Sequence, residues 1–180
     1  MALKLIKTKI KIVLAAHGSP PKDFPKQELI EYFSLNMRLE HAPQSVDDKT
    51  KARIHELDQK IRKWPRTKEN DPFFFSSMEI ANNIAKKTGF ETFTAFNEFC
   101  VPTIEETLIQ AITKGASKIV VITPMMTPGG EHSEVDIPAT IAKVKKNYKN
   151  IDIIYAWPFE LSAVADFLVS QTSKHLLSAP

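Results

Sequence analysis

The chain has 180 residues, enough for one ordinary domain or two very small ones. Hydrophobic residues make up 43% and charged residues 25%, which excludes a mainly disordered chain, a collagen and a coiled coil. The net charge is only +3 and the basic residues form no nucleic-acid-binding pattern, so we expect no nucleic-acid partner. No apolar run approaches the roughly 18 residues of a membrane helix, so we expect no membrane partner either.

The N-terminal residues interleave lysines with apolar side chains and lack the apolar core of a signal peptide. We therefore predict a cytoplasmic protein. The single cysteine, Cys100, excludes an internal disulfide and a multi-cysteine metal cluster, and we interpret it as an apolar packing residue.

The first predicted element is a strand over residues 9–16. It is ended by the glycine, serine and two prolines of residues 18–21, which disfavour continuation of a strand. A highly charged segment follows: residues 22–71 contain no glycine, and 21 of these 50 residues are charged. Apolar residues recur at helical spacing in two runs of this segment. They are Leu29, Ile30, Phe33 and Met37, then Ile54, Leu57, Ile61 and Trp64. We predict two amphipathic helices, which form a helical insertion over about residues 22–72.

From residue 76 onward, helices and strands alternate. The pattern predicts helices over residues 76–88, 102–114, 134–148 and 160–177, and strands over 91–96, 118–123 and 151–156. Such alternation predicts an α/β fold with a four-stranded parallel sheet flanked by helices in three layers. We expect residues 1–180 to form a single domain of this kind, with the helical insertion after strand one.

Ligands of open parallel sheets bind beyond the carboxyl ends of the strands. Three side chains that can bind a metal ion or transfer a proton follow three of the predicted strands: His17, Glu98 and His132. Two histidines and a carboxylate are a suitable ligand set for a divalent metal such as cobalt, nickel, iron or zinc. We also expect Ser19 and the pair Gly129 and Gly130 to contact a ligand, because glycine lets the backbone approach closely.

Several of these segments together resemble the CbiX family of sirohydrochlorin chelatases, which are class II tetrapyrrole chelatases. The segments are AAHGSP at 15–20, NEFCVPTIEETL at 97–108, KIVVITP at 118–124 and TPGGEHSEVDIP at 127–138. The resemblance implies insertion of Co²⁺, or alternatively Fe²⁺ or Ni²⁺, into sirohydrochlorin or a related tetrapyrrole. His17 and His132 would be the family's two histidines, Glu98 its acidic residue, and the chain a homodimer without an organic cofactor.

Three other interpretations remain open. The chain could bind metal or tetrapyrrole without catalysis. It could transfer phosphoryl groups with His17 as nucleophile, although its arginines (Arg38, Arg53, Arg62 and Arg66) all lie in the insertion. It could also be an interaction module whose insertion is the functional surface.

Overall fold

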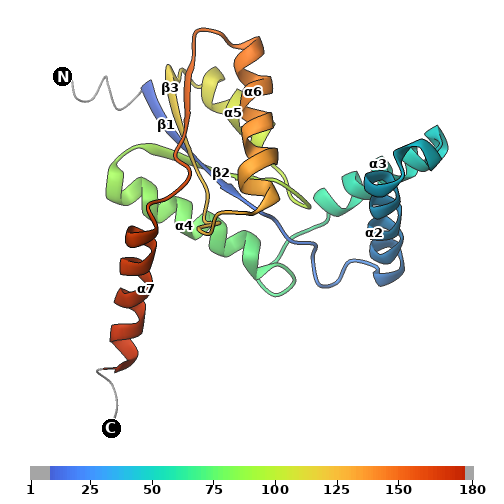
Figure 1. Ribbon diagram of the computed structural model, residues 1–180, viewed down its shortest axis with the longest axis horizontal. Coiled ribbons are helices and arrows are strands. Elements are labelled where there is room, and N and C mark those ends of the chain that lie inside the picture. The colour runs from blue at the N-terminus through green and yellow to red at the C-terminus, as the bar shows by residue number, and fades with distance from the viewer. Residues whose placement is uncertain (1–8, 177–180) are drawn as a thin grey trace.

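The computed structural model describes residues 9–176, which form a parallel sheet with helices around it (Figure 1). The strands are β1 (Ile10–Ala16), β2 (Glu91–Phe96), β3 (Lys118–Ile122) and β4 (Asp152–Tyr155), in the order β2-β1-β3-β4. All neighbouring strands are parallel. The predicted α/β fold and four-stranded sheet are confirmed. Residues 1–8, on which the signal-peptide interpretation depends, and Leu177 lie outside the described residues.

Helices α5 (Ile104–Thr113) and α6 (Ile137–Asn147) pack on one face of the sheet. The core between them is aliphatic, because alternate strand residues such as Val13, Ile119 and Ile153 point to this face. Helix α5 begins with a capping box between Thr103 and Glu106. None of the helices within residues 9–176 is long and apolar enough to cross a membrane.

The opposite face of the sheet is covered by α4 (Pro72–Thr88), which contacts β1 and β2. Here Phe74 of α4 stacks on Phe96 of β2, with 5.1 Å between ring centroids. The final helix, α7 (Leu161–Leu176), extends away from the sheet beyond β4 (Figure 1). Helices therefore flank the sheet on both sides, as the three-layer prediction requires.

The charged segment after β1 forms α2 (Lys26–His41), a short 3₁₀ turn (Pro43–Ser45) and α3 (Asp48–Arg62). The two helices lie side by side beyond the C-terminal end of β1 (Figure 1). Ion pairs join them: Arg53 donates to Glu31 at 2.8 Å, and Lys60 contacts Glu28 at 2.6 Å. The two predicted helices of the insertion are thus present, with the break at Pro43.

Two predicted helix starts were wrong. Helix α4 begins at Pro72 rather than residue 76, because the Asp71 side chain accepts a hydrogen bond from the Phe74 backbone and Pro72 suits the first turn. The helix predicted from residue 134 begins instead as a π-helical turn over His132–Asp136, followed by α6. Pro138 lies in the first turn of α6, where its missing N–H is tolerated.

Candidate functional site

Three loops meet at the carboxyl edge of the sheet. The chain passes from β1 outward to β2 and then returns across β1 to β3, so the strand order reverses between β1 and β3. His17 follows β1 at this reversal, His132 lies in the segment after β3, and Glu98 follows β2. A reversal of strand order is the place where parallel sheets bind ligands.

The side chains of His17, Glu98 and His132 gather into one cluster, which we call the site trio. Glu98 Oε2 lies 3.9 Å from the Nε2 atom of His17 and 3.9 Å from that of His132. One ligand atom from each residue lies within 4.8 Å of the other two. The structure therefore brings together all three residues that the sequence predicted as metal ligands.

Each histidine of the trio has its Nδ1 atom engaged on the side away from Glu98. Nδ1 of His17 lies 2.7 Å from the Gly18 carbonyl oxygen, and Nδ1 of His132 lies 2.6 Å from Asp136 Oδ2. The Gly18 carbonyl can only accept, so Nδ1 of His17 carries the proton, whereas Nδ1 of His132 contacts both the Asp136 carboxylate and, at 2.8 Å, the Asn97 amide nitrogen. In both rings Nε2 is the nitrogen that faces the Glu98 carboxylate, where it can bind a metal ion.

Distances in the trio suit capture of a metal ion by a small closing movement. Bonds of about 2.0–2.2 Å to a tetrahedral metal place neighbouring ligand atoms about 3.3 Å apart. The trio atoms lie farther apart, with 3.9 Å from Glu98 to each histidine and all three atoms within 4.8 Å of one another, and their side chains are 26–40% exposed. An ion from solvent can therefore reach the site, where side-chain rotations would bring the three atoms into its coordination shell.

Gly18 allows the loops after β1 and β2 to touch. The β1–β2 hydrogen bonding continues past the strands, because the backbone N–H of Glu98 donates to the His17 carbonyl at 2.8 Å. Gly18 has a φ of +103°, and a Cβ atom there would lie 1.9 Å from the Glu98 carbonyl oxygen. Only glycine fits this approach, and the approach holds His17 and Glu98 side by side.

Two further residues of the site were missed by the sequence reasoning. Asp136 accepts a hydrogen bond from His132, and Asn97 Nδ2 donates to the same Asp136 oxygen at 3.0 Å. Asp136 follows His132 by four residues, and this i, i+4 spacing on a helical turn was the available signal. Partners of this kind fix the ring orientation of a metal-binding histidine.

The insertion is bound to the site loops by two arginines, Arg62 and Arg66. Arg62 donates to the Cys100 carbonyl at 3.0 Å. Arg66 donates to the Ser19 carbonyl at 2.7 Å, and also to the Phe99 carbonyl and the Asp71 carboxylate. Two arginines of the insertion therefore lie near the strand ends, although they are far from those strand ends in the sequence. They hold backbone carbonyls there, which counts against the phosphoryl-transfer interpretation.

Helix α2 brings a tyrosine close to the trio. The hydroxyl of Tyr32 donates to Asp58 at 3.3 Å. Burial, followed by the negative charges of Asp58 and Glu98, raises the pKa of Tyr32 to about 12. Tyr32 therefore stays neutral at physiological pH. The Tyr32 ring packs 6.2 Å from the ring of Phe99, the residue that follows Glu98.

Cys100 is fully buried behind the site. Burial raises the pKa of its thiol, which keeps the sulfur protonated. This agrees with its interpretation as a packing residue.

Ser19, Gly129 and Gly130 lie on the loops around the trio, and their expected contact with a ligand stays a prediction. The Ser19 carbonyl is held by Arg66. Gly129 has a φ of +95°, and its N–H donates to the Glu134 side chain at 2.8 Å. The Gly130 carbonyl accepts from Glu134 N and Ser133 Oγ, both at 3.0 Å. These bonds shape the loop that leads into His132.

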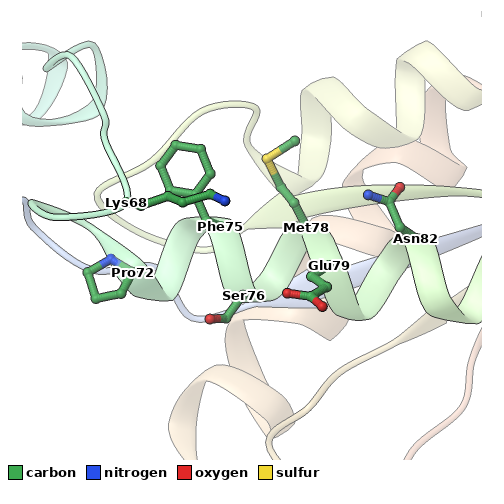
Figure 2. Close-up of a pocket in the computed structure, with 7 residues that line it drawn as sticks. All are labelled: Lys68, Pro72, Phe75, Ser76, Met78, Glu79 and Asn82. Atoms are coloured by element: carbon green, nitrogen blue, oxygen red, sulfur yellow. The ribbon is translucent and has the colours of Figure 1, made fainter.

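A separate pocket of about 370 Å³ lies along the outer surface of α4. Figure 2 shows the residues that line it, among them Lys68, Phe75, Met78 and Glu79. None of the trio lines this pocket, and we assign it no role in the site.

Comparison with known proteins decides the family. The family model for CbiX matches residues 76–173, more than half of the chain. The chain belongs to the CbiX family. The matched region includes Glu98 and His132, while His17 lies before it.

Two curated CbiX-like relatives, both from Priestia megaterium, match shorter segments. One is named a sirohydrochlorin cobaltochelatase and is 37% identical over 65 residues, which is 36% of this chain and 21% of the relative. The other is named a sirohydrochlorin ferrochelatase and is 31% identical over 80 residues, 44% of this chain and 30% of the relative. The matches thus span less than a third of either relative's length.

The comparison with solved structures finds matches of low identity. The cobalt complex of the sirohydrochlorin chelatase SirB from Bacillus subtilis subspecies spizizenii is 21% identical, with a TM-score of 0.42. That alignment covers 83% of this chain and 43% of SirB. A putative cobalamin biosynthesis CbiX protein from Marinobacter aquaeolei VT8 is 18% identical, with a TM-score of 0.45, and the alignment covers 93% and 97% of the two chains.

Proposed function

We propose that this protein inserts a divalent metal ion into a metal-free tetrapyrrole, with sirohydrochlorin as the substrate. The observation that carries the proposal is the site trio, with two Nε2 lone pairs and one carboxylate within 4.8 Å at the carboxyl edge of the sheet. Membership of the CbiX family and the names of the two curated relatives support the same reaction. Co²⁺ is the first candidate metal and Fe²⁺ or Ni²⁺ the alternatives, because a site of nitrogen and oxygen ligands accepts each of them.

The reaction exchanges two pyrrole protons for one M²⁺ ion, and the trio supplies groups for both halves of this exchange. His17, His132 and Glu98 hold the ion next to the ring, which makes the transfer effectively unimolecular. Each imidazole that releases the ion regains a lone pair and accepts one of the two protons. The Glu98 carboxylate offsets the charge of the ion and then of the protonated rings, and its exposure lets protons pass to solvent.

Orientation of the trio is set before the ion arrives. Asp136 and the Gly18 carbonyl hold the rings of the two histidines in orientation. Arg66 holds the Ser19 carbonyl, and Gly18 sets the spacing of His17 and Glu98. A preorganised site needs little rearrangement when the ion binds, which favours fast transfer.

We also propose that the chain acts as a homodimer, for which α7 provides the surface. Helix α7, all of whose residues the structure describes, has no buried side chain. Leu161, Leu168 and Val169 are 54–63% exposed, and Ile154 of β4 is 40% exposed. Exposed apolar patches of this kind mark protein contacts. Light scattering after size exclusion should give twice the chain mass, and Leu168→Glu should shift it to the monomer. A monomeric parent protein would contradict the proposal.

The test of the proposed function is an anaerobic absorbance assay with sirohydrochlorin and Co²⁺, from which the spontaneous insertion rate is subtracted. The parent protein is compared with His17→Ala and His132→Ala, and His55→Ala serves as the control because His55 is exposed on α3. We expect insertion by the parent protein and the control, and loss in both trio variants. Metal or tetrapyrrole binding without insertion would establish the binding-protein interpretation instead.

A further inference from the structure

Helix α2 carries a row of apolar side chains that the fold leaves in solvent. Ile30, Phe33 and Met37 are 65%, 45% and 61% exposed. Their spacing of three and four residues places them on one face of the helix. The opposite face is occupied, since Glu28 and Glu31 pair with α3. An exposed row of three large apolar residues next to a functional site is the mark of a binding surface.

Aromatic contacts connect this row directly to the trio. The Phe33 ring contacts Phe99, with 5.9 Å between centroids, and Phe99 lies 6.3 Å from the His17 ring. Phe99 itself is buried, and the rings on either side of it, Phe33 and His17, are both partly exposed. The exposed side of Phe33 therefore lies two ring contacts from His17.

Helix α2 is held in this position by polar contacts on its other side. Arg53 pairs with Glu31, and Tyr32 donates to Asp58, so α2 is joined to α3. The end of α3 is in turn joined to the site loops by Arg62. The apolar row is thus connected to the site loops through α3 by these polar contacts.

We propose that Phe33, Ile30 and Met37 form the wall against which one face of the tetrapyrrole ring packs while the trio acts at its centre. This inference rests on the proposed function and names the surface that positions its substrate. A tetrapyrrole is a broad, flat, conjugated ring, and aromatic side chains bind such faces by offset stacking and by excluding water. The insertion then serves as the substrate-positioning part of the protein, and Phe33 is a specificity residue rather than a catalytic one.

The test measures binding of metal-free sirohydrochlorin by quenching of its fluorescence, with no metal present, in the parent protein, Phe33→Ala and Phe33→Trp. The control is Phe73→Ala, since Phe73 on α4 is 39% exposed, similar to Phe33. We expect Phe33→Ala to raise the Kd for the ring about tenfold, as loss of one aromatic contact does. Phe33→Trp and Phe73→Ala should keep the parent Kd, and Co²⁺ affinity without the ring should be unchanged in all variants.

Three outcomes distinguish this inference from the proposed function. An unchanged Kd in Phe33→Ala, with the parent protein binding the ring, would overturn the inference and leave the chelatase proposal intact. Binding that depends on Phe33 without metal insertion by the parent protein would support the wall and overturn the chelatase proposal. Failure of the parent protein to bind the ring would overturn both.

Discussion

Asp136 lies one helical turn after His132, and its Oδ2 atom accepts a hydrogen bond from Nδ1 of that histidine at 2.6 Å. Both residues lie on the π-helical turn, where side chains four positions apart are neighbours. It turns Nε2 of His132 toward Glu98, where the second histidine also points its Nε2 atom. Asp136 is thus a positioning residue for a metal ligand.

Removal of the Asp136 carboxylate should weaken metal binding. We expect Asp136→Ala to lower Co²⁺ affinity about 10- to 100-fold, as loss of such partners generally does. Isothermal titration calorimetry measures this, with Asp48→Ala as the control because the Asp48 side chain is 99% exposed. Equal Co²⁺ affinity in Asp136→Ala and the parent protein would show that His132 needs no orienting partner.

A Cβ atom at Gly18 should destabilise the protein through the loop after β2. Gly18→Ala places a carbon 1.9 Å from the Glu98 carbonyl oxygen and adds strain at a φ of +103°. We expect a loss of about 3 kcal/mol in the free energy of unfolding. Urea denaturation measures it against Gly115→Ala, where φ is +84° and the Cβ atom meets no neighbour within 4 Å. That control should lose only about 1 kcal/mol, and equal losses would contradict the clash.

Arg66 should contribute more to stability than any exposed arginine of the insertion. Its side chain is 8% exposed and its partner Asp71 only 1% exposed. Arg66→Met would leave the Asp71 charge and the Phe99 carbonyl buried without their donor. We expect a loss of about 3–5 kcal/mol in the free energy of unfolding. Arg38→Met is the matched control, because Arg38 makes only exposed bonds to Ser45. Similar losses in both variants would disprove the role of Arg66.

The ion pair of Lys11 and Glu91 should make stability depend on pH. Hydrogen bonding by Lys11, followed by its charge, holds the pKa of Glu91 below its usual range. A carboxyl with a lowered folded-state pKa stabilises the fold above its unfolded pKa of about 4.3 and loses this effect as pH falls through the lower value. We expect Glu91→Gln to be less stable than the parent protein at pH 7 and nearly equal to it near pH 3. Urea denaturation at both pH values measures this, and a constant difference would contradict it.

The order of helices and strands could be predicted from the sequence because each element carries its own periodicity. The apolar run of residues 119–122 and the clear stops at Gly89 and Gly115 define strands and helices without reference to the rest of the chain. Convergence of His17, Glu98 and His132 followed from topology alone, since carboxyl ends of parallel strands share one edge.

Contacts that depend on side-chain geometry could not be predicted from the sequence. The i, i+4 spacing of His132 and Asp136 is visible in the sequence, but the contact of Asn97 with both residues is not, because it depends on how the loops pack. Arg66 lies far from residues 19 and 99 in the chain, and only folding of the insertion brings it to their carbonyls. The cytoplasmic location, the single-domain organisation and the absence of an organic cofactor stay predictions.

The most direct test of the account is the position of cobalt in crystals soaked anaerobically with Co²⁺, located by anomalous scattering. We expect one strong peak within about 2.0–2.3 Å of Nε2 of His17, Nε2 of His132 and a Glu98 oxygen. Cobalt bound elsewhere, with the site trio still 3.9 Å apart and free of metal, would contradict the central claim.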